Sequence, residues 1–270
     1  VIALFIPVLI ALLYENKISS AVKSFIFIVC ALLITAIILS YTRAAWVALA
    51  GALGCLFIYI LKIKNWVVYT GIGLVVLTYA LFHVEITMYL ERNDKTSSTD
   101  YAKHVQSIGN ISTDDSNIER LNRWSCALRM FNEKPLLGYG PGTYMFQYGQ
   151  FQKHSERSGI STNFAEGGGS HSEYLGPLSE MGVFGILSML LIVTAIFYKG
   201  ITLYNRWPKE ETEIRTLLLA MILALTTYFV HGVLNNFLDT DKAAVPIWGI
   251  CAIFIAMEVQ LNKRIAVRKD

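Results

Sequence analysis

The chain has 270 residues, of which 54% are hydrophobic and only 16% are charged. Average soluble domains carry about 25% charged residues, so the composition argues against a soluble enzyme, a disordered chain and a nucleic-acid binder. The net charge of +3 is too small to indicate a polyanionic partner. Because the chain opens with Val1 inside an apolar run, we interpret it as a C-terminal part of a longer protein.

Seven apolar runs have the composition of helices that cross a bilayer, which takes about 20 such residues. Backbone polar groups in lipid must be satisfied within the segment, so each run predicts a helix, the first of them incomplete. The sequence therefore predicts an all-α, polytopic membrane protein of about seven spans. The runs are Val1–Leu13, Val22–Leu39, Ala44–Leu61, Trp66–Phe82, Tyr174–Tyr198, Thr216–Val233 and Ala244–Val259.

Three regions follow from these runs: residues 1–84 with four spans, a large polar segment 85–170, and residues 171–270 with three spans and a tail. The loops on one side hold twelve Lys and Arg residues, whereas the short loops on the other side hold only Arg43 and Lys242. Basic loops mark the cytoplasmic side of a membrane. We therefore expect the C-terminus inside the cell and the segment 85–170 outside.

The outer segment contains a second pattern, an amphipathic helix predicted over Ile118–Lys134 and ended by Pro135. Such a helix can lie along the membrane surface. A glycine-rich turn follows, and then an aromatic stretch in which Tyr144 shares one face with Tyr148. The apolar positions of the helix are Ile118, Leu121, Trp124, Leu128 and Phe131.

Four basic or titratable residues of separate segments map to this outer face. Arg43 lies between two spans, where it either anchors the chain at the lipid headgroups or has a functional role. Arg120 and Arg123 lie three apart on the helix and form either a solvated face or a phosphate site, since guanidinium groups bind phosphate in a bidentate manner. His171 stands where the chain re-enters the membrane; it is either an interfacial cap or a base that titrates near neutral pH.

Further polar groups lie close to the same face. Glu180, in the first turns of the fifth span, can pair with an arginine or line a cavity. His231 forms four-residue steps with Asn235 and Asp239, but Asn is a poor ligand for a transition metal, so polar contacts between helices are the better interpretation. The cysteines show no metal-ligand spacing, and we expect neither a metal nor another cofactor.

Two classes of function fit a membrane protein of this kind. Three arginines and a histidine on one face suit the transfer of a group from a lipid diphosphate to an acceptor hydroxyl, because the arginines can neutralise the diphosphate and the histidine can remove a proton. A transporter without chemistry predicts charged groups near the bilayer midplane and broken helices. The predicted spans have apolar centres, which favours the enzyme.

Three stretches resemble the bacterial O-antigen ligase and polymerase superfamily of membrane glycosyltransferases. The first is the junction Thr42-Arg43-Ala44-Ala45. The second begins with Arg120 and Trp124 and runs on to Lys134-Pro135-Leu136-Leu137-Gly138-Tyr139-Gly140-Pro141-Gly142. The third is His171-Ser172, then nine residues, Gly182, two residues and Gly185. This last spacing is similar to a signature of the ligases.

The resemblance implies a GT-C-like, inverting and metal-independent glycosyltransferase of the bacterial inner membrane, with its active face in the periplasm. The donor would be a glycan on undecaprenyl diphosphate. Arg43 and Arg120 would hold the diphosphate, and His171 would activate or position the acceptor hydroxyl. The expected additional contacts to the diphosphate or glycan are Arg123, Tyr144, Glu180 and His231.

The resemblance leaves the acceptor open. A ligase transfers the glycan to lipid A core, a polymerase transfers it to a growing glycan, and a related transferase uses a protein. Trp124 stands where ligases often have Leu, and Thr42 stands where Ser is common. The expected role is therefore surface polysaccharide biosynthesis, as a ligase or, alternatively, as a polymerase.

Overall fold

The computed structural model describes residues 1–40, 42–64, 67, 70, 115–164 and 168–267. These residues form helices and connecting loops and contain no strand. The fourth predicted span, Trp66–Phe82, and the polar stretch from Glu85 to Asp114 lie outside the described residues apart from residues 67 and 70. The helices are α1 (Ile2–Leu13), α2 (Ser20–Leu39), α3 (Arg43–Ile60), α6 (Asp115–Glu133), α7 (Tyr144–Phe151), the short 3-10 helix η2 (His154–Glu156), α8 (Leu175–Arg206), α9 (Thr212–His231) and α10 (Asp241–Val267).

Among the described residues, four helices are long and apolar enough to cross a membrane: α2, α8, α9 and α10. They coincide with four of the predicted spans. The helices α1 and α3 are apolar but shorter; at a rise of 1.5 Å per residue the 12 residues of α1 extend for only about 18 Å. The described part of the chain is thus all-helical and contains four candidate membrane spans.

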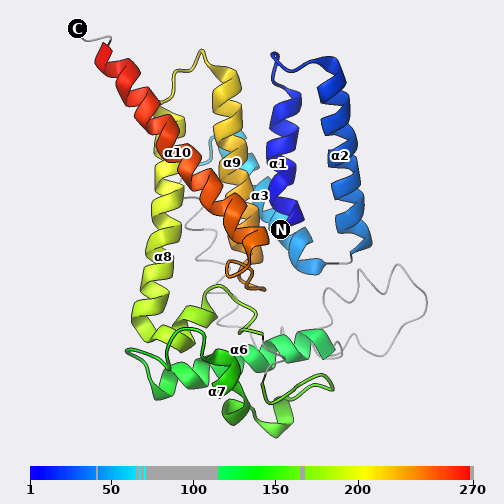
Figure 1. Cartoon of the computed structure of the whole chain (residues 1–270), viewed down its shortest axis with the longest axis vertical. Helices are drawn as coiled ribbons and strands as arrows, with labels where there is room; N and C mark the ends of the chain where they lie inside the picture. Colours follow the sequence, from blue (N-terminus) through cyan, green and yellow to red (C-terminus); the bar gives the residue numbers. More distant parts are fainter. Residues whose placement is uncertain (41, 65–66, 68–69, 71–114, 165–167, 268–270) are drawn as a thin grey trace.

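Helix α9 is the centre of the helix bundle, packed between α1 and α3 on one side and α8 on the other (Figure 1). Its buried positions include Leu218, Ala224, Leu225 and Phe229, which join a core with residues of α8 and α10. Large side chains on α2, α8 and α10 are exposed instead, among them Phe25 at 66%. A bundle with a buried central helix and apolar outer surfaces is what a lipid environment requires.

The two ends of the bundle differ in composition (Figure 1). The α1–α2 loop, the α8–α9 loop and the C-terminal end of α10 lie together at one end, and their basic residues predict that this end is cytoplasmic. At this end Glu258 of α10 pairs with Lys199 at 2.8 Å and with Arg206 at 3.5 Å. Helices α6 and α7 lie at the opposite end, together with the segment that contains His171.

Helix α6 confirms the predicted amphipathic helix, and besides its apolar stripe it has a second face that is buried within the protein. Leu121 and Leu128 of the predicted apolar stripe are 43% and 46% exposed. The buried positions lie on another face and include polar side chains, because these find hydrogen-bond partners in the segment after α7. The buried residues of α6 are Glu119, Asn122, Arg123, Cys126, Ala127 and Met130.

Helix α8 has a sharp bend at Gly182, where φ is +64° and ψ is −152°. The turn that follows α6 packs into this bend: the Val183 amide donates to the Pro135 carbonyl at 2.8 Å, and the Gly140 amide donates to the Glu180 carbonyl at 2.7 Å. A side chain at Gly182 would lie 2.4 Å from the carbonyl oxygen of Leu136. The two glycine motifs found in the sequence therefore meet, and their joint role is to dock α6 and α7 onto the membrane helices.

Candidate functional site

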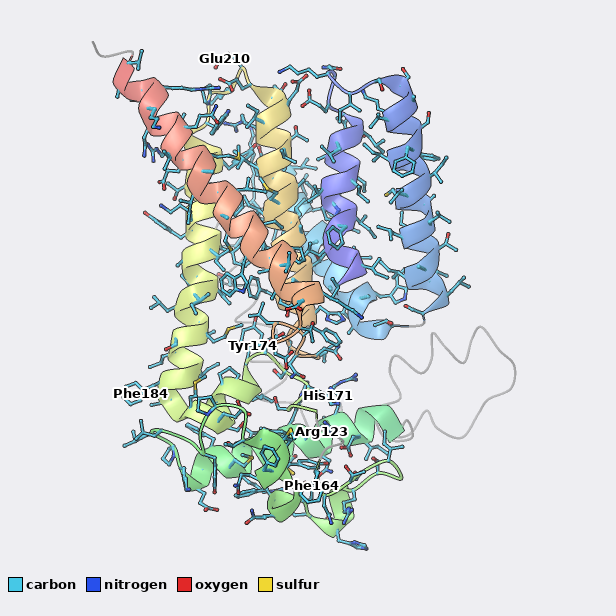
Figure 2. All side chains as sticks on the ribbon, viewed as in Figure 1. Arg123, Phe164, His171, Tyr174, Phe184 and Glu210 are labelled. Atoms are coloured by element: carbon cyan, nitrogen blue, oxygen red, sulfur yellow. The ribbon has the colours of Figure 1, made fainter. Side chains whose placement is uncertain are left out.

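His171 occupies a short segment between α6 and the outer ends of α8, α9 and α10 (Figure 2). Its φ of +55° is in the left-handed region, which non-glycine residues rarely adopt and which costs about 1–2 kcal/mol. Neighbouring hydrogen bonds hold this conformation: the Ser170 hydroxyl donates to the Ser172 carbonyl at 3.1 Å, and the Trp124 indole N–H lies 3.5 Å from the His171 carbonyl. Strained residues of this kind concentrate at functional sites.

Two arginines of α6 act on the His171 imidazole. Burial, together with the positive charges of Arg123 and Arg120, lowers the pKa of His171 to about 4, while the negative charge of Glu119 opposes this shift. His171 is therefore neutral at pH 7, with a lone pair available to accept a proton. The structure thus brings Arg120, Arg123 and His171 close enough for their charges to interact. The sequence alone predicted only that the three residues lie on the same side of the membrane.

Arg123 is nearly inaccessible, at 5% exposure. Its Nε donates to the Glu119 carboxylate at 2.7 Å, and its Nη1 donates to the Gly169 carbonyl at 3.0 Å. The guanidinium also lies over the ring of Tyr148, 5.5 Å from the ring centre. Of the interpretations that the sequence left open, a solvated face does not hold for Arg123, because α7 and the segment after it cover the side chain. Arg120, three residues earlier on α6, is only half-buried.

His231 ends α9 and belongs to the same end of the molecule. Its ring stacks on that of Phe237, with ring centres 5.7 Å apart, and it lies close enough to Arg120 for an electrostatic interaction. Both rings border a mostly apolar cavity of about 240 Å³, whose lining also includes Ser40 and Thr42. Arg43 directly follows Thr42 as the first residue of α3, so its backbone stands beside this cavity.

The O-antigen ligase family profile matches residues 28–190, which is more than half of the chain and includes Arg43, Arg120 and His171. The chain belongs to the O-antigen ligase family. This family consists of membrane-embedded, glycosyltransferase-like enzymes that act on lipid-linked glycans in surface polysaccharide biosynthesis. No curated protein and no solved structure matches the chain, so the arrangement of its site rests on the geometry given above.

Two residues that the sequence suggested as contacts to the diphosphate or glycan, Tyr144 and Glu180, have hydrogen-bond partners within the protein. Tyr144 is 1% exposed, and its hydroxyl donates to the Arg123 carbonyl at 2.7 Å. The Glu180 carboxylate accepts from the amides of Gly142 at 3.0 Å and Tyr144 at 2.9 Å, so it caps the beginning of α7. Both residues help to place α7 beside α6.

A buried carboxylate that the sequence did not single out, Glu173, fixes the other side of the site. Its Oε1 accepts from the amides of Phe237 at 2.6 Å and Leu238 at 2.8 Å, and from the Tyr228 hydroxyl. Its own amide donates to the Gly232 carbonyl at 2.8 Å. Glu173 thereby ties the α9–α10 loop to the His171 segment. The sequence contained one indication of this role, a charged residue close to His171 at the start of an apolar helix. A carboxylate buried there needs hydrogen-bond partners.

Proposed function

We propose that this protein is a glycosyltransferase that moves a glycan from undecaprenyl diphosphate to an acceptor hydroxyl at the periplasmic face of the bacterial inner membrane, as an O-antigen ligase. The observation that carries the proposal is a neutral histidine, in a strained turn at the edge of the membrane helices, beside two arginines of α6. Family membership supports a lipid-linked glycan as the donor.

In this mechanism the acceptor oxygen attacks the anomeric carbon of the donor sugar. A new C–O bond forms, the bond to the diphosphate oxygen breaks, and the diphosphate leaves with the electron pair. His171 takes the proton of the acceptor hydroxyl as the bond forms. Attack from the side opposite to the leaving group inverts the anomeric centre.

Arg120 and Arg43 neutralise the leaving diphosphate in our proposal. Arginine stays protonated at every physiological pH and binds phosphate oxygens in a bidentate manner, so two guanidinium groups supply the stabilisation that a metal ion supplies elsewhere. The mostly apolar cavity beside His231 suits the hydrocarbon next to the diphosphate. The location of Thr42 and Ala45 in the same lining supports Arg43 as a donor contact.

The bound donor would also strengthen the base. In the free protein the charges of Arg120 and Arg123 disfavour a protonated His171. A diphosphate beside these arginines offsets their charge and raises the pKa of the imidazole. His171 then accepts a proton most readily when the donor is in place, which couples donor binding to acceptor activation.

A transfer assay with the purified intact protein in lipid nanodiscs tests this function. The donor is a polyprenyl-diphosphate glycan with a labelled sugar, offered with lipid A core or alone. Label on lipid A core supports the ligase, whereas longer glycans on the polyprenyl carrier support the alternative, a polymerase. Movement of intact donor across the bilayer with no new glycosidic bond would overturn the enzyme and favour a polysaccharide transporter.

A further inference from the structure

Beneath the site lies a buried carboxylate with no part in the proposed transfer, Glu119 of α6, which is 3% exposed. Its Oε1 accepts from Arg123 at 2.7 Å and from the Tyr148 hydroxyl at 2.8 Å. Its Oε2 accepts from the hydroxyls of Ser158, at 3.2 Å, and Ser161. Both oxygens are occupied by protein donors, so the carboxylate has no room for a substrate.

The electrostatics agree with this arrangement. Burial alone would raise the pKa of Glu119, but the hydrogen bonds from Ser161, Arg123 and Tyr148 outweigh it and hold the pKa below the ordinary value. Glu119 is thus a negative charge beneath the site at neutral pH. A buried carboxylate with this many donors is a fixed point from which another side chain can be oriented.

The side chain that Glu119 orients is Arg123. The Arg123 Nε donates a hydrogen bond to Glu119, and this contact directs Nη1 to donate to the carbonyl of Gly169, two residues before His171. The planar fork of arginine makes both contacts in fixed directions, which a lysine cannot do. Arg123 therefore joins the rigid helix α6 to the strained segment that carries His171 (Figure 2).

We infer that Glu119 and Arg123 form a positioning pair, which holds the His171 segment in its left-handed turn and sets the charge balance beside the imidazole. The inference rests on the proposed function, in which His171 is the base. In this inference Arg123 orients the His171 segment and does not bind the donor, because only 5% of the residue is exposed. Arg120 is left as the α6 arginine that meets the diphosphate.

The pair has a signature that a purely structural role lacks, because its two members act on His171 with opposite sign. Arg123 lowers the pKa of His171 and Glu119 raises it; Arg120, also on α6, is the other charge that lowers it. Removal of the Arg123 charge therefore raises the pKa of His171, and removal of the Glu119 charge lowers it. A general disturbance of packing would shift the pKa of His171 in the same direction in both variants.

The experiment compares Glu119→Gln, Arg123→Gln and Arg123→Lys in the intact protein, with the acid limb of the kcat–pH profile measured at saturating donor. We expect the acid limb of Arg123→Gln to lie about one pH unit higher than that of the unmodified protein. We expect the acid limb of Glu119→Gln to lie at lower pH than that of the unmodified protein. Arg123→Lys keeps the charge and loses the fork, so its kcat falls while its limb stays in place. The double variant Glu119→Gln/Arg123→Gln removes both charges, and its limb returns toward the original pH.

A second readout separates this inference from the proposed function. The His171 imidazole is titrated by NMR with labelled histidine, of which the chain has five, and its signal is assigned by its loss in His171→Ala. Opposite shifts of the imidazole pKa in the two Gln variants support the positioning pair. They do so even if His171→Ala retains transfer activity, because retained activity would overturn only the role of His171 as the base. Equal or absent shifts, in variants with an unchanged midpoint of thermal unfolding, would overturn the positioning pair.

Discussion

The bend of α8 makes a sharp prediction about the substitution Gly182→Ala. The backbone there has φ +64° and ψ −152°, a region essentially restricted to glycine. The added Cβ would lie 2.4 Å from the Leu136 carbonyl oxygen and 2.6 Å from that of Pro135. Both neighbours are backbone atoms, so neither can rotate out of the way, and the turn after α6 must move away from the bend.

The expected cost has two parts. A strained backbone conformation costs about 1–3 kcal/mol, and an overpacked contact costs about 1–3 kcal/mol more. The sum of about 2–6 kcal/mol is a large share of the 5–15 kcal/mol that typically stabilises a folded protein. We expect the docking of α6 and α7 to loosen, so that the thermal unfolding midpoint and the transfer rate both fall.

Two other glycines provide matched controls for the unfolding assay on protein in nanodiscs. Gly142 has φ +72° but open space around it, so Gly142→Ala incurs only the backbone cost, about 1–2 kcal/mol. Gly249 lies inside α10, also with open space, so Gly249→Ala is expected to be neutral or slightly stabilising. The predicted order of stability is Gly249→Ala, then Gly142→Ala, then Gly182→Ala. A Gly182→Ala protein as stable as Gly249→Ala would refute the packing of the turn on the bend.

Three further predictions concern the site. In the unmodified protein the acid limb of kcat/KM, which reports the free enzyme, should lie near pH 4, because the pKa of His171 is about 4. Activity needs the neutral imidazole and is lost as the pH falls through that pKa. The acid limb of kcat should lie at higher pH, since the bound diphosphate raises this pKa; coincident limbs would contradict donor-assisted activation. Glu173→Gln should keep one acceptor oxygen for the amides of Phe237 and Leu238 but lose its negative charge, costing about 1–3 kcal/mol and speeding hydrogen exchange in residues 232–240; unchanged exchange would show that the charge of Glu173 does not hold this loop. Arg120→Lys should keep the charge but lose bidentate binding, which raises the donor KM at least several-fold; a KM equal to that of the unmodified protein would remove Arg120 from the donor site.

Much of the helical framework could be predicted from local patterns in the sequence. The runs of apolar residues predicted the four long helices to within a few residues at many of their ends, and the three- and four-residue steps predicted α6. These features depend on the composition of one segment and on the cost of unsatisfied backbone groups in lipid, so a single stretch of sequence contains the information. The number of spans and the side of the membrane stay predictions.

The buried face of α6 could not be predicted in the same way. Glu119 and Asn122 are polar and by pattern belong outside, yet they are buried because Tyr148, Ser158 and Ser161 supply hydrogen-bond partners. Those partners lie 26 to 42 positions away from them in the chain. No periodicity within α6 contains this information, so the sequence pointed to the arginines but not to the carboxylate that orients one of them.

His171 shows the same division between local and distant information. Its residue type and its place before an apolar helix were enough to suggest a base, and the spacing to Gly182 supported the family. Its left-handed backbone lies next to the Arg123–Gly169 contact, and its low pKa depends on burial and on the two arginine charges from α6. These features arise only when α6 docks onto the bend of α8.

The most direct test of the central claim is the rate at which purified His171→Ala transfers labelled glycan from polyprenyl diphosphate to an acceptor. His154, in η2 on the same side of the membrane helices, is exposed, and His154→Ala is the matched control. General acid–base catalysis contributes about 10²–10⁴-fold, so we predict a loss of that order in kcat for His171→Ala and an unchanged kcat for His154→Ala. A fully active His171→Ala protein, with its fold intact by thermal unfolding, would contradict the assignment of His171 as the base.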